Sequence, residues 1–484
     1  MKAQSAGNKY KKGMATLELL IAFMILILCI SAVVMVTFGN QSFAVSSQTN
    51  NEAISEAQKA LEDTRALSRQ DFDSVVSGPI TISDPMYNGQ IIVDPFAATE
   101  CSKQIEAKIT WDTDINEPQV IDLFSRVADV PEALNLGGDC SAVPPGPGPL
   151  IKGANGVNLG GAKTNGLDVF NKIVYIALEN APGLAFINAT DFNNPLEIVN
   201  GYNVGSEAND VDVARDPNTS KVYAYVARET DTDQLQVIDV TNPNAPVFKY
   251  NINLPEVVGS SEPEAHRVYY YKNRLYVTTK ETAGPELHIF DASHPANPLP
   301  KLGVAELNRT VNDFVVVDQE IGGTDYAVAY MAADSNLKEV GVFDVTTPGT
   351  ATEMFSLDMT GGGDAYSLFF SSISKLLYIG RLSNSAEELY AFDASDSFTT
   401  LTEKAKRETG ANEISMRAAG GFIYLSSDSS NKDFQVYNAD PSTGLALVSN
   451  SNNSNKGAGV DYEDQFIYLI FNQGSKTLQV YYAP

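Results

Sequence analysis

Cysteine and histidine are scarce in this sequence, with three of each among 484 residues. A zinc-ribbon array or a histidine-rich metal centre needs more of these donors, so both kinds of site are excluded. Basic residues are also outnumbered, with 33 Lys and Arg against 60 Asp and Glu, which leaves a net charge of −27. A chain this acidic repels nucleic acid, and we expect no nucleic-acid partner.

Signatures of catalysis are missing as well. The chain has no nucleophile elbow, phosphate-binding loop or zincin motif. Two acidic runs, 210–216 and 229–233, offer hard oxygen donors, but neither follows the twelve-residue calcium loop with its central Gly and final Glu. We therefore expect a binding protein that is not an enzyme, without a cofactor or a metal site.

One long apolar run occupies residues 17–38, and Glu18 is its single charged residue. About 20 apolar residues in a helix are enough to cross a bilayer. Four lysines precede the run, and no Lys or Arg follows it until Lys59. The positive-inside rule therefore predicts a single-pass membrane protein with a cytoplasmic N-terminus and its bulk on the outer side.

Two simpler interpretations of this run remain open. A secretory signal peptide has a shorter apolar core, of about 7–15 residues, and a small-residue cleavage site, which does not follow here. A plain signal anchor needs no acidic residue near its start, and Glu18 costs roughly 2.5–3.5 kcal/mol in a membrane helix. Glu18 is therefore expected to have a partner and a role.

The segment Lys11-Lys12-Gly13-Met14-Ala15-Thr16-Leu17-Glu18 resembles the processing site of type IV prepilins, although that family more often has Phe where Met14 stands. The resemblance implies that 1–13 is a leader, that prepilin peptidase cuts between Gly13 and Met14, and that Met14 is then methylated. It also implies that Glu18 neutralises the new amine of a neighbouring pilin subunit during assembly at the inner membrane. Opposite charges removed from water favour one register of helix packing.

The apolar helix is expected to continue as an amphipathic spine, over 14–70 in all. Small or apolar residues recur there at helical spacing, at Ala53, Ala57, Ala60, Leu61, Thr64 and Leu67. A solvated helix is the alternative. Short alternating segments follow and predict antiparallel strands, at Pro79–Ser83, Gln90–Asp94, Gln104–Trp111 and Val120–Phe124. Together they predict a small pilin-like α+β head over 71–142.

Cys101 and Cys140 flank these strands. An oxidising exterior makes a disulfide between them the expected state, with two free thiols as the alternative. The segment 143–149, Val-Pro-Pro-Gly-Pro-Gly-Pro, cannot form a helix or a central strand, so it predicts a stiff linker between domains.

The remainder of the chain, 150–484, is repetitive. A short apolar segment ending in Asp, Asn or Tyr returns every 44–53 residues, at 183–188, 234–239, 286–291, 339–344, 388–393, 433–438 and 477–482. A second strand precedes each segment, and further strands flank the pair. Four short strands in each such unit are typical of β-propeller blades, so the pattern predicts seven blades, with an open solenoid as the alternative. The segment Leu235–Asp239 within this series resembles the LVIVD repeats of bacterial surface propellers.

Three further expectations concern the propeller. The seventh unit lacks a fourth strand, and residues 150–161 are expected to supply it and close the ring. The repeated terminal Asp is expected to stabilise a turn through its own side chain. If first strands line the central channel, one mouth should carry an acidic ring that favours cations, sugars or a basic peptide, with the candidate residues Asp210, His266, Asp313, Tyr366, Glu413 and Asp461.

The sequence thus predicts a mainly β protein, with a membrane-spanning helix, a small α+β head and a seven-bladed propeller. Its expected role is a minor pilin-like subunit, at the pilus or cell surface after processing, that recognises a glycan, protein or cation outside the cell. A secretion-system pseudopilin that holds cargo and a membrane-tethered propeller enzyme are the alternatives.

Overall fold

The computed structural model describes most of the chain, namely residues 11–98, 101–112, 118–136 and 150–483 without 200, 231, 255–263, 336, 362, 373, 383–385, 397, 430, 454 and 473–475. Contacts within the chain divide it into two compact units. The first unit contains Met1–Ile92 and Ile105–Ser125, and the second contains Val93–Gln104 and Arg126–Pro484. Each unit is described by itself.

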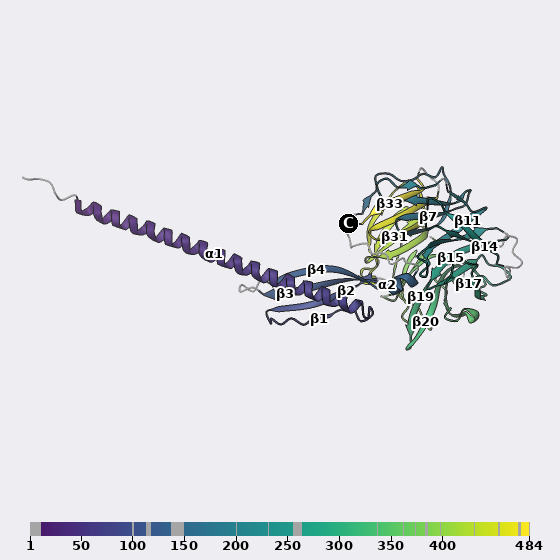
Figure 1. Ribbon diagram of the computed structural model, residues 1–484, viewed down its shortest axis with the longest axis horizontal. Coiled ribbons are helices and arrows are strands. Elements are labelled where there is room, and N and C mark those ends of the chain that lie inside the picture. Colours follow the sequence, from purple (N-terminus) through teal and green to yellow (C-terminus); the bar gives the residue numbers. More distant parts are fainter. Residues whose placement is uncertain are drawn as a thin grey trace, which may run out of the picture. The chain divides into compact units, whose positions relative to one another are not determined.

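The helix α1 (Lys11–Ser68) dominates the first unit (Figure 1). Its stretch Leu20–Thr37 has a mean hydropathy of 3.0 and no buried residue, so α1 is long and apolar enough to cross a membrane. Further along, the helix buries a stripe of small residues at the predicted spacing, from Ala53 to Thr64. The predicted inward position of Leu67 is wrong: Leu67 is 40% exposed, and Ser68 is buried in its place.

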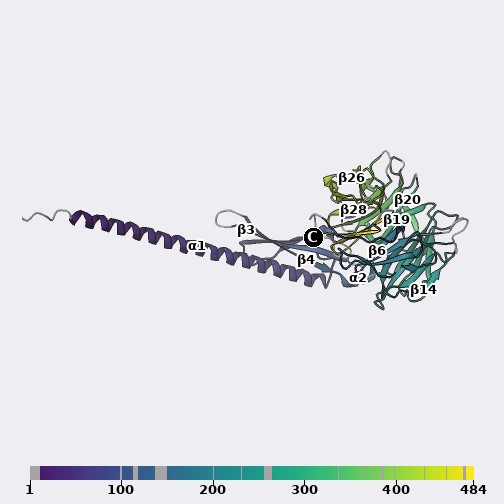
Figure 2. The ribbon, with the colours of Figure 1, turned by 90° about the horizontal axis from the view of Figure 1, so that it is seen from above.

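A four-stranded sheet with the order β1-β2-β3-β4 accompanies the second half of α1; all four strands are labelled in Figure 1, and β3 and β4 are seen beside the helix in Figure 2. The tyrosine Tyr87 fixes the helix to the sheet, because its hydroxyl donates to the Thr49 carbonyl oxygen at 3.1 Å and its ring packs edge-on against Trp111. Each predicted segment contains a strand, and three strands run further than predicted; the bounds are β1 (Gly78–Ile80), β2 (Tyr87–Ala98), β3 (Ser102–Asp112) and β4 (Pro118–Ala128).

The second unit contains a short helix that was not predicted from the sequence, α2 (Val130–Asn135). Glu132 on this helix and Asp318 both lie 2.5 Å from the ammonium of Lys272. Burial works against the charge of Lys272, but the two carboxylates raise its pKa above the usual range. The predicted linker, 143–149, lies outside the described residues.

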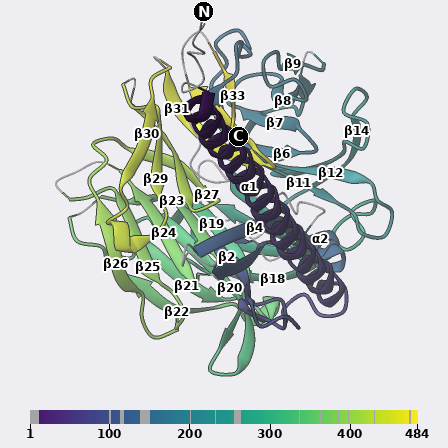
Figure 3. The ribbon, with the colours of Figure 1, turned by 90° about the vertical axis from the view of Figure 1, so that its left-hand side faces the viewer.

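Blade-like antiparallel sheets make up the rest of the second unit. In each sheet the strands follow one another from the inside outward, as β23, β24, β25 and β26 do in Figure 3. The first sheet pairs β6 (Thr164–Phe170), β7 (Ile173–Leu178) and β8 (Gly183–Asn188), and both β9 (Leu196–Glu197) and β10 (Tyr202–Asn203) pair with β8. The second sheet contains β11 (Glu207–Arg215), β12 (Val222–Glu229), β13 (Leu235–Asp239) and β14 (Val247–Ile252). The third sheet contains β15 (Ala265–Tyr271), β16 (Arg274–Thr279), β17 (Leu287–Asp291) and β18 (Lys301–Ala305).

Three more sheets have the same four-stranded arrangement and precede the last sheet. Their strands are β19 (Thr310–Ile321), β20 (Thr324–Asp334), β21 (Val340–Asp344), β22 (Thr352–Leu357); β23 (Ala365–Ser371), β24 (Leu376–Arg381), β25 (Leu389–Asp393), β26 (Thr402–Arg407); and β27 (Glu413–Ala419), β28 (Phe422–Ser427), β29 (Phe434–Asn438), β30 (Leu447–Ser451). The last sheet contains β31 (Lys456–Glu463), β32 (Phe466–Asn472), β33 (Leu478–Tyr482) and β5 (Ile151–Lys152).

The last sheet joins the two ends of the repeat region. Strand β5 pairs antiparallel with β33, with Lys152 opposite Tyr481 and Ile151 opposite Tyr482. The innermost strands contact one another in order from β6 to β31, and β31 in turn contacts β6. The pairing covers part of the segment 150–161 that was predicted to complete the last sheet, and the regular strand is shorter than expected. Strand β5 therefore covers the outer edge of β33, which would otherwise be unpaired there.

Apolar clusters lie between neighbouring sheets and hold the ring together. One cluster joins Val328, Tyr330 and Val342 of one sheet to Leu368 and Leu377 of the next. The middle strands are buried on both faces, so their sequences are continuous apolar runs without the alternation of a half-exposed strand. This packing between sheets holds the inner strands around the centre of the ring.

Candidate functional site

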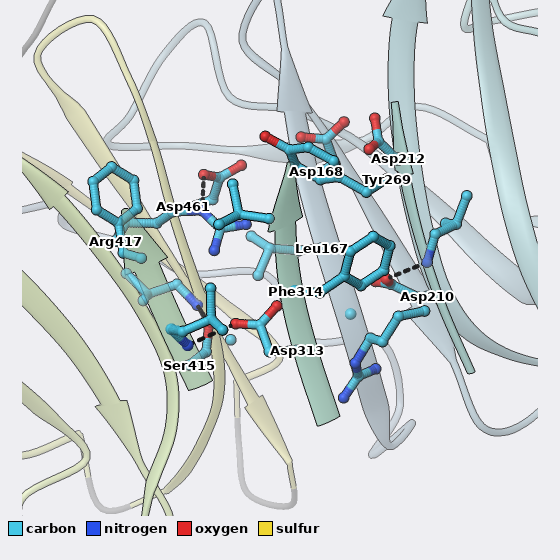
Figure 4. Close-up of a pocket in the computed structure, with 18 of the residues that line it drawn as sticks. Leu167, Asp168, Asp210, Asp212, Tyr269, Asp313, Phe314, Ser415, Arg417 and Asp461 are labelled. Carbon is cyan, nitrogen blue, oxygen red and sulfur yellow. Dashed lines mark hydrogen bonds and ion pairs between the residues drawn. The ribbon is translucent and has the colours of Figure 1, made fainter. Parts of the chain in front are cut away.

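A cavity of about 680 Å³ lies at the centre of the second unit, between the inner strands (Figure 4). Pockets that take small ligands usually measure about 300–1,000 Å³ and combine apolar walls with a few convergent polar groups. The lining includes side chains from all of the strands β6, β11, β15, β19, β23, β27 and β31. The cavity is therefore the candidate site of this protein.

Each inner strand carries a β-bulge near its start, after its first or second paired residue. On β11 the register shifts between Ala208 and Asp210, and on β15 it shifts between Ala265 and Arg267. The same shift occurs on the other inner strands. The bulge residues are Asn165, Asn209, His266, Asn312, Tyr366, Ile414 and Ala458.

The bulges define two tiers of side chains. We call the residues directly after the bulges the first tier; they are Gly166, Asp210, Arg267, Asp313, Ser367, Ser415 and Gly459. The residues two positions further form the second tier; they are Asp168, Asp212, Tyr269, Val315, Phe369, Arg417 and Asp461. Every second-tier residue lines the cavity, because strand side chains alternate and the intervening residues are buried between sheets.

The second tier has a polar side and an apolar side. Going around the ring, three neighbouring strands contribute carboxylates, Asp461, Asp168 and Asp212. The three strands on the other side contribute apolar or aromatic side chains, from Tyr269 to Phe369. The seventh strand, β27, contributes Arg417 between the two sides.

The carboxylates are held in place by the neighbouring sheets. One oxygen of Asp212 accepts the Tyr270 N–H at 2.7 Å, and one oxygen of Asp313 accepts the Leu368 N–H at 3.0 Å. Asp210 and Asp168 accept the N–H groups of Val268 and Val213 in the same way. Each bond joins one sheet to the next, so the side chains serve the fold while also facing the cavity.

Burial changes the protonation of these acids. It raises the pKa of Asp210 to about 6 and that of Asp212 to about 7, and the hydrogen bond from the Tyr270 N–H offsets part of the rise at Asp212. Burial also raises the pKa values of Asp313 and Asp461, against the attraction of Arg417. These groups are poised to titrate nearer neutrality than ordinary carboxylates.

Two arginines offset the acidic lining. Arg417 Nε donates to Asp461 Oδ1 at 3.1 Å, and the carboxylates of Asp461 and Asp313 raise the pKa of Arg417 despite its burial. Arg267 Nη1 donates to the Asn209 carbonyl oxygen at 3.2 Å. The two tiers therefore hold five Asp and two Arg side chains, and they form a mixed polar surface with a moderate excess of acid.

The bulge residues link the sheets by a second set of bonds. The side-chain amides of Asn165, Asn209 and Asn312 each donate at 2.9 Å to a carbonyl oxygen of the next inner strand. His266 does the same, with Nδ1 2.7 Å from the Val311 carbonyl oxygen. A carbonyl only accepts, so Nδ1 carries the proton, and burial lowers the pKa of His266 to about 3. His266 is a neutral substitute for the repeated Asn.

The six residues predicted to form one ring do not share one position. Asp210 and Asp313 lie in the first tier, and Asp461 lies in the second. His266 and Tyr366 are bulge residues, and Glu413 precedes the bulge of β27. All of these except Glu413 contribute to the cavity lining; the side chain of Glu413 lies outside those described.

The Asp that ends several of the third strands stabilises a turn, as predicted. The carboxylates of Asp291, Asp344 and Asp393 each accept the N–H group two residues later, at 2.9–3.0 Å. The buried acids at the start of the same strands were not predicted to have a role. Glu388, for example, accepts the Thr409 N–H at 2.8 Å. The neutral Gln234, in the equivalent position before β13, accepts the Leu254 N–H at 2.9 Å.

The predicted processing and assembly residues, Gly13, Met14 and Glu18, all lie within α1, and their side chains are outside those described. Cys101 is buried, and Cys29 is the free cysteine among the described residues. Cys140 lies outside the described residues, so its pairing with Cys101 stays a prediction.

The sequence analysis missed Asp168, Tyr269, Phe369 and Arg417 as cavity residues. The signal that could have found them is the offset from the bulge, two residues after the first tier in every unit. Asp212 had been considered only as part of an acidic run.

Comparisons with known proteins add little to this site. No protein-family model matches the chain, and no curated protein matches it. Among solved structures, it resembles a protein from Lactobacillus plantarum (15% identity, TM-score 0.47, covering 72% of this chain and 92% of that one) and Sqt1 from Saccharomyces cerevisiae (9%, 0.47, 69% and 99%). It also resembles BamB from Moraxella catarrhalis (12%, 0.39, 84% and 96%).

Proposed function

We propose that this protein is a minor type IV pilin-like subunit that displays a seven-bladed β-propeller outside the cell for adhesion or ligand recognition. The observation that carries the proposal is α1. It runs without a break from an unburied apolar half to a half that packs against a sheet. A helix with both halves suits a subunit that is stored in a membrane and assembled through that helix.

The processing motif supports the same role. Cleavage between Gly13 and Met14 would leave Glu18 as the fifth residue of the mature chain, with no other charge until Glu52. An apolar surface of this length can enter a filament core formed by other pilin subunits. The single carboxylate then favours one register by pairing with a neighbour's N-terminal amine.

Binding at the cavity, without catalysis, is the second half of the proposal. The carboxylates and arginines of the two tiers are engaged with backbone groups or with one another, as expected of a rigid recognition surface. A disulfide between Cys101 and Cys140 would strengthen the head outside the cell.

Mass and N-terminal sequence of the protein from native membranes test the processing step. A mature chain that begins at methylated Met14 supports the proposal. A chain that retains Met1 contradicts it and reduces the protein to a signal-anchored surface propeller. The variant Gly13→Asp should block processing, whereas the neighbouring change Ala15→Ser should leave it intact.

A further inference from the structure

The central cavity has features that select among the ligands an extracellular propeller could recognise. We infer that it binds a neutral saccharide, with the sugar ring against the apolar side of the second tier and its hydroxyl groups against the polar side. This inference rests on the proposed function, because it names the ligand class of the same recognition site.

The apolar side provides a surface for the C–H face of a sugar. Tyr269, Val315 and Phe369 come from three successive strands and are only partly buried. Tyr269 packs edge-on against Phe314, with ring centroids 5.8 Å apart, and this contact supports its ring from behind. Aromatic rings held in this way present an apolar surface at little entropic cost.

The polar side provides acceptors and donors in fixed orientations, and the first tier adds to them. The Asp212 carboxylate of the polar side is oriented by the Tyr270 N–H, and the Asp313 carboxylate of the first tier is oriented by the Leu368 N–H. A carboxylate has about four acceptor sites, so each of these groups retains capacity for a hydroxyl donor. Arg417, oriented by Asp461, supplies guanidinium donors for hydroxyl and ring oxygens.

The charge pattern favours a neutral ligand over a cation. Arg417 lies among Asp461, Asp313 and Asp168 and interacts with all three carboxylates. The Arg417 guanidinium therefore already occupies the position where a lysine or arginine side chain of a partner would bind. An anionic ligand is disfavoured by the five Asp side chains and by the net charge of the chain. Hydroxyl groups, which both donate and accept, suit a surface of this kind.

The test uses the full-length protein in detergent and an array of neutral, acidic and basic oligosaccharides, with an oligolysine peptide as a cationic probe. We expect saturable binding of at least one neutral oligosaccharide. The variants Phe369→Ala and Arg417→Lys, on the two sides of the cavity, should each weaken it by about tenfold or more. Phe248→Ala is the matched control, because Phe248 is an exposed aromatic residue on the outer strand β14.

The outcomes separate the two proposals. Oligolysine binding without saccharide binding overturns the saccharide inference and leaves recognition by the propeller standing. Failure of both probes to bind a folded protein overturns the inference and the recognition role together. Equal weakening by Phe248→Ala also overturns the inference, because it places the ligand outside the cavity. Prepilin processing is read from mass alone and does not depend on any of these results.

Discussion

Glu388 tests the idea that a buried polar side chain just before a third strand fixes the turn that follows the fourth strand of the same sheet. Its side chain is fully buried, and one carboxylate oxygen accepts the Thr409 N–H at 2.8 Å and the Gly410 N–H at 3.2 Å. Gln234 holds the same position three sheets earlier in the series and makes the same contact with a neutral side chain.

The change Glu388→Ala should therefore be costly and Glu388→Gln should not. Removing the acceptor leaves the buried Thr409 N–H unsatisfied, and a hydrogen bond to a charged group is worth about 1.5–3 kcal/mol. With the lost side-chain packing, we expect Glu388→Ala to lower the free energy of unfolding by about 2–4 kcal/mol. Glu388→Gln keeps a carbonyl oxygen in place and should cost about 1 kcal/mol or less.

Urea unfolding followed by near-UV circular dichroism measures the effect. Glu387→Ala is the control, because Glu387 is partly exposed and pairs with Lys406 at 3.4 Å. Such pairs contribute about 0–1 kcal/mol. If Glu388→Ala and Glu387→Ala shift the unfolding midpoint equally, the proposed role of the buried acid is refuted.

Three further predictions concern the ring. Burial raises the pKa of Asp212 to about 7 in the folded state, far above the value near 4 in an unfolded chain, so the folded state loses stability as pH rises from about 4 to 7. The stability of Asp212→Asn relative to wild type, measured by urea titration, should therefore increase between pH 5 and 8. A difference that stays constant over this range would contradict the prediction. The free energy of unfolding of His266→Asn should lie within about 0.5 kcal/mol of wild type, whereas His266→Ala should lose about 1 kcal/mol because the hydrogen bond to the next strand is gone. Equal losses in the two variants would refute the idea that His266 substitutes for the repeated Asn. Gly153→Ala should lower the midpoint of thermal unfolding, because the new Cβ would lie 2.3 Å from the Phe192 carbonyl oxygen, next to strand β5. Gly78→Ala is the control, because its new Cβ would lie in open space. Equal midpoints for the two variants would argue against closure of the ring by β5.

The repeat architecture could be predicted from the sequence because its strongest signal is local. All third strands but the last consist of four or five apolar or β-prone residues and end in a turn-forming Asp or Asn, as in Leu235–Asp239 and Leu287–Asp291. The missing fourth strand of the last unit predicted the pairing of residues 150–161 with β33. Both inferences depended on pattern and on the cost of an open sheet edge.

The cavity could not be predicted in the same way, because each inner strand has a bulge near its start. One extra residue moves the following side chains to the opposite face. Asp210 and His266 looked equivalent in the sequence, yet one follows a bulge and the other occupies it. The short helix α2 was missed because six residues carry too little periodicity to indicate a helix.

The position of the propeller on filaments tests the central claim most directly. Filaments sheared from intact cells should carry the protein, and antibodies against the 150–484 region should label them in electron micrographs. Label should disappear from filaments, and the protein should remain in the membrane, when Gly13→Asp blocks processing. Filaments that are free of the protein, with label confined to the membrane of wild-type cells, would contradict the account.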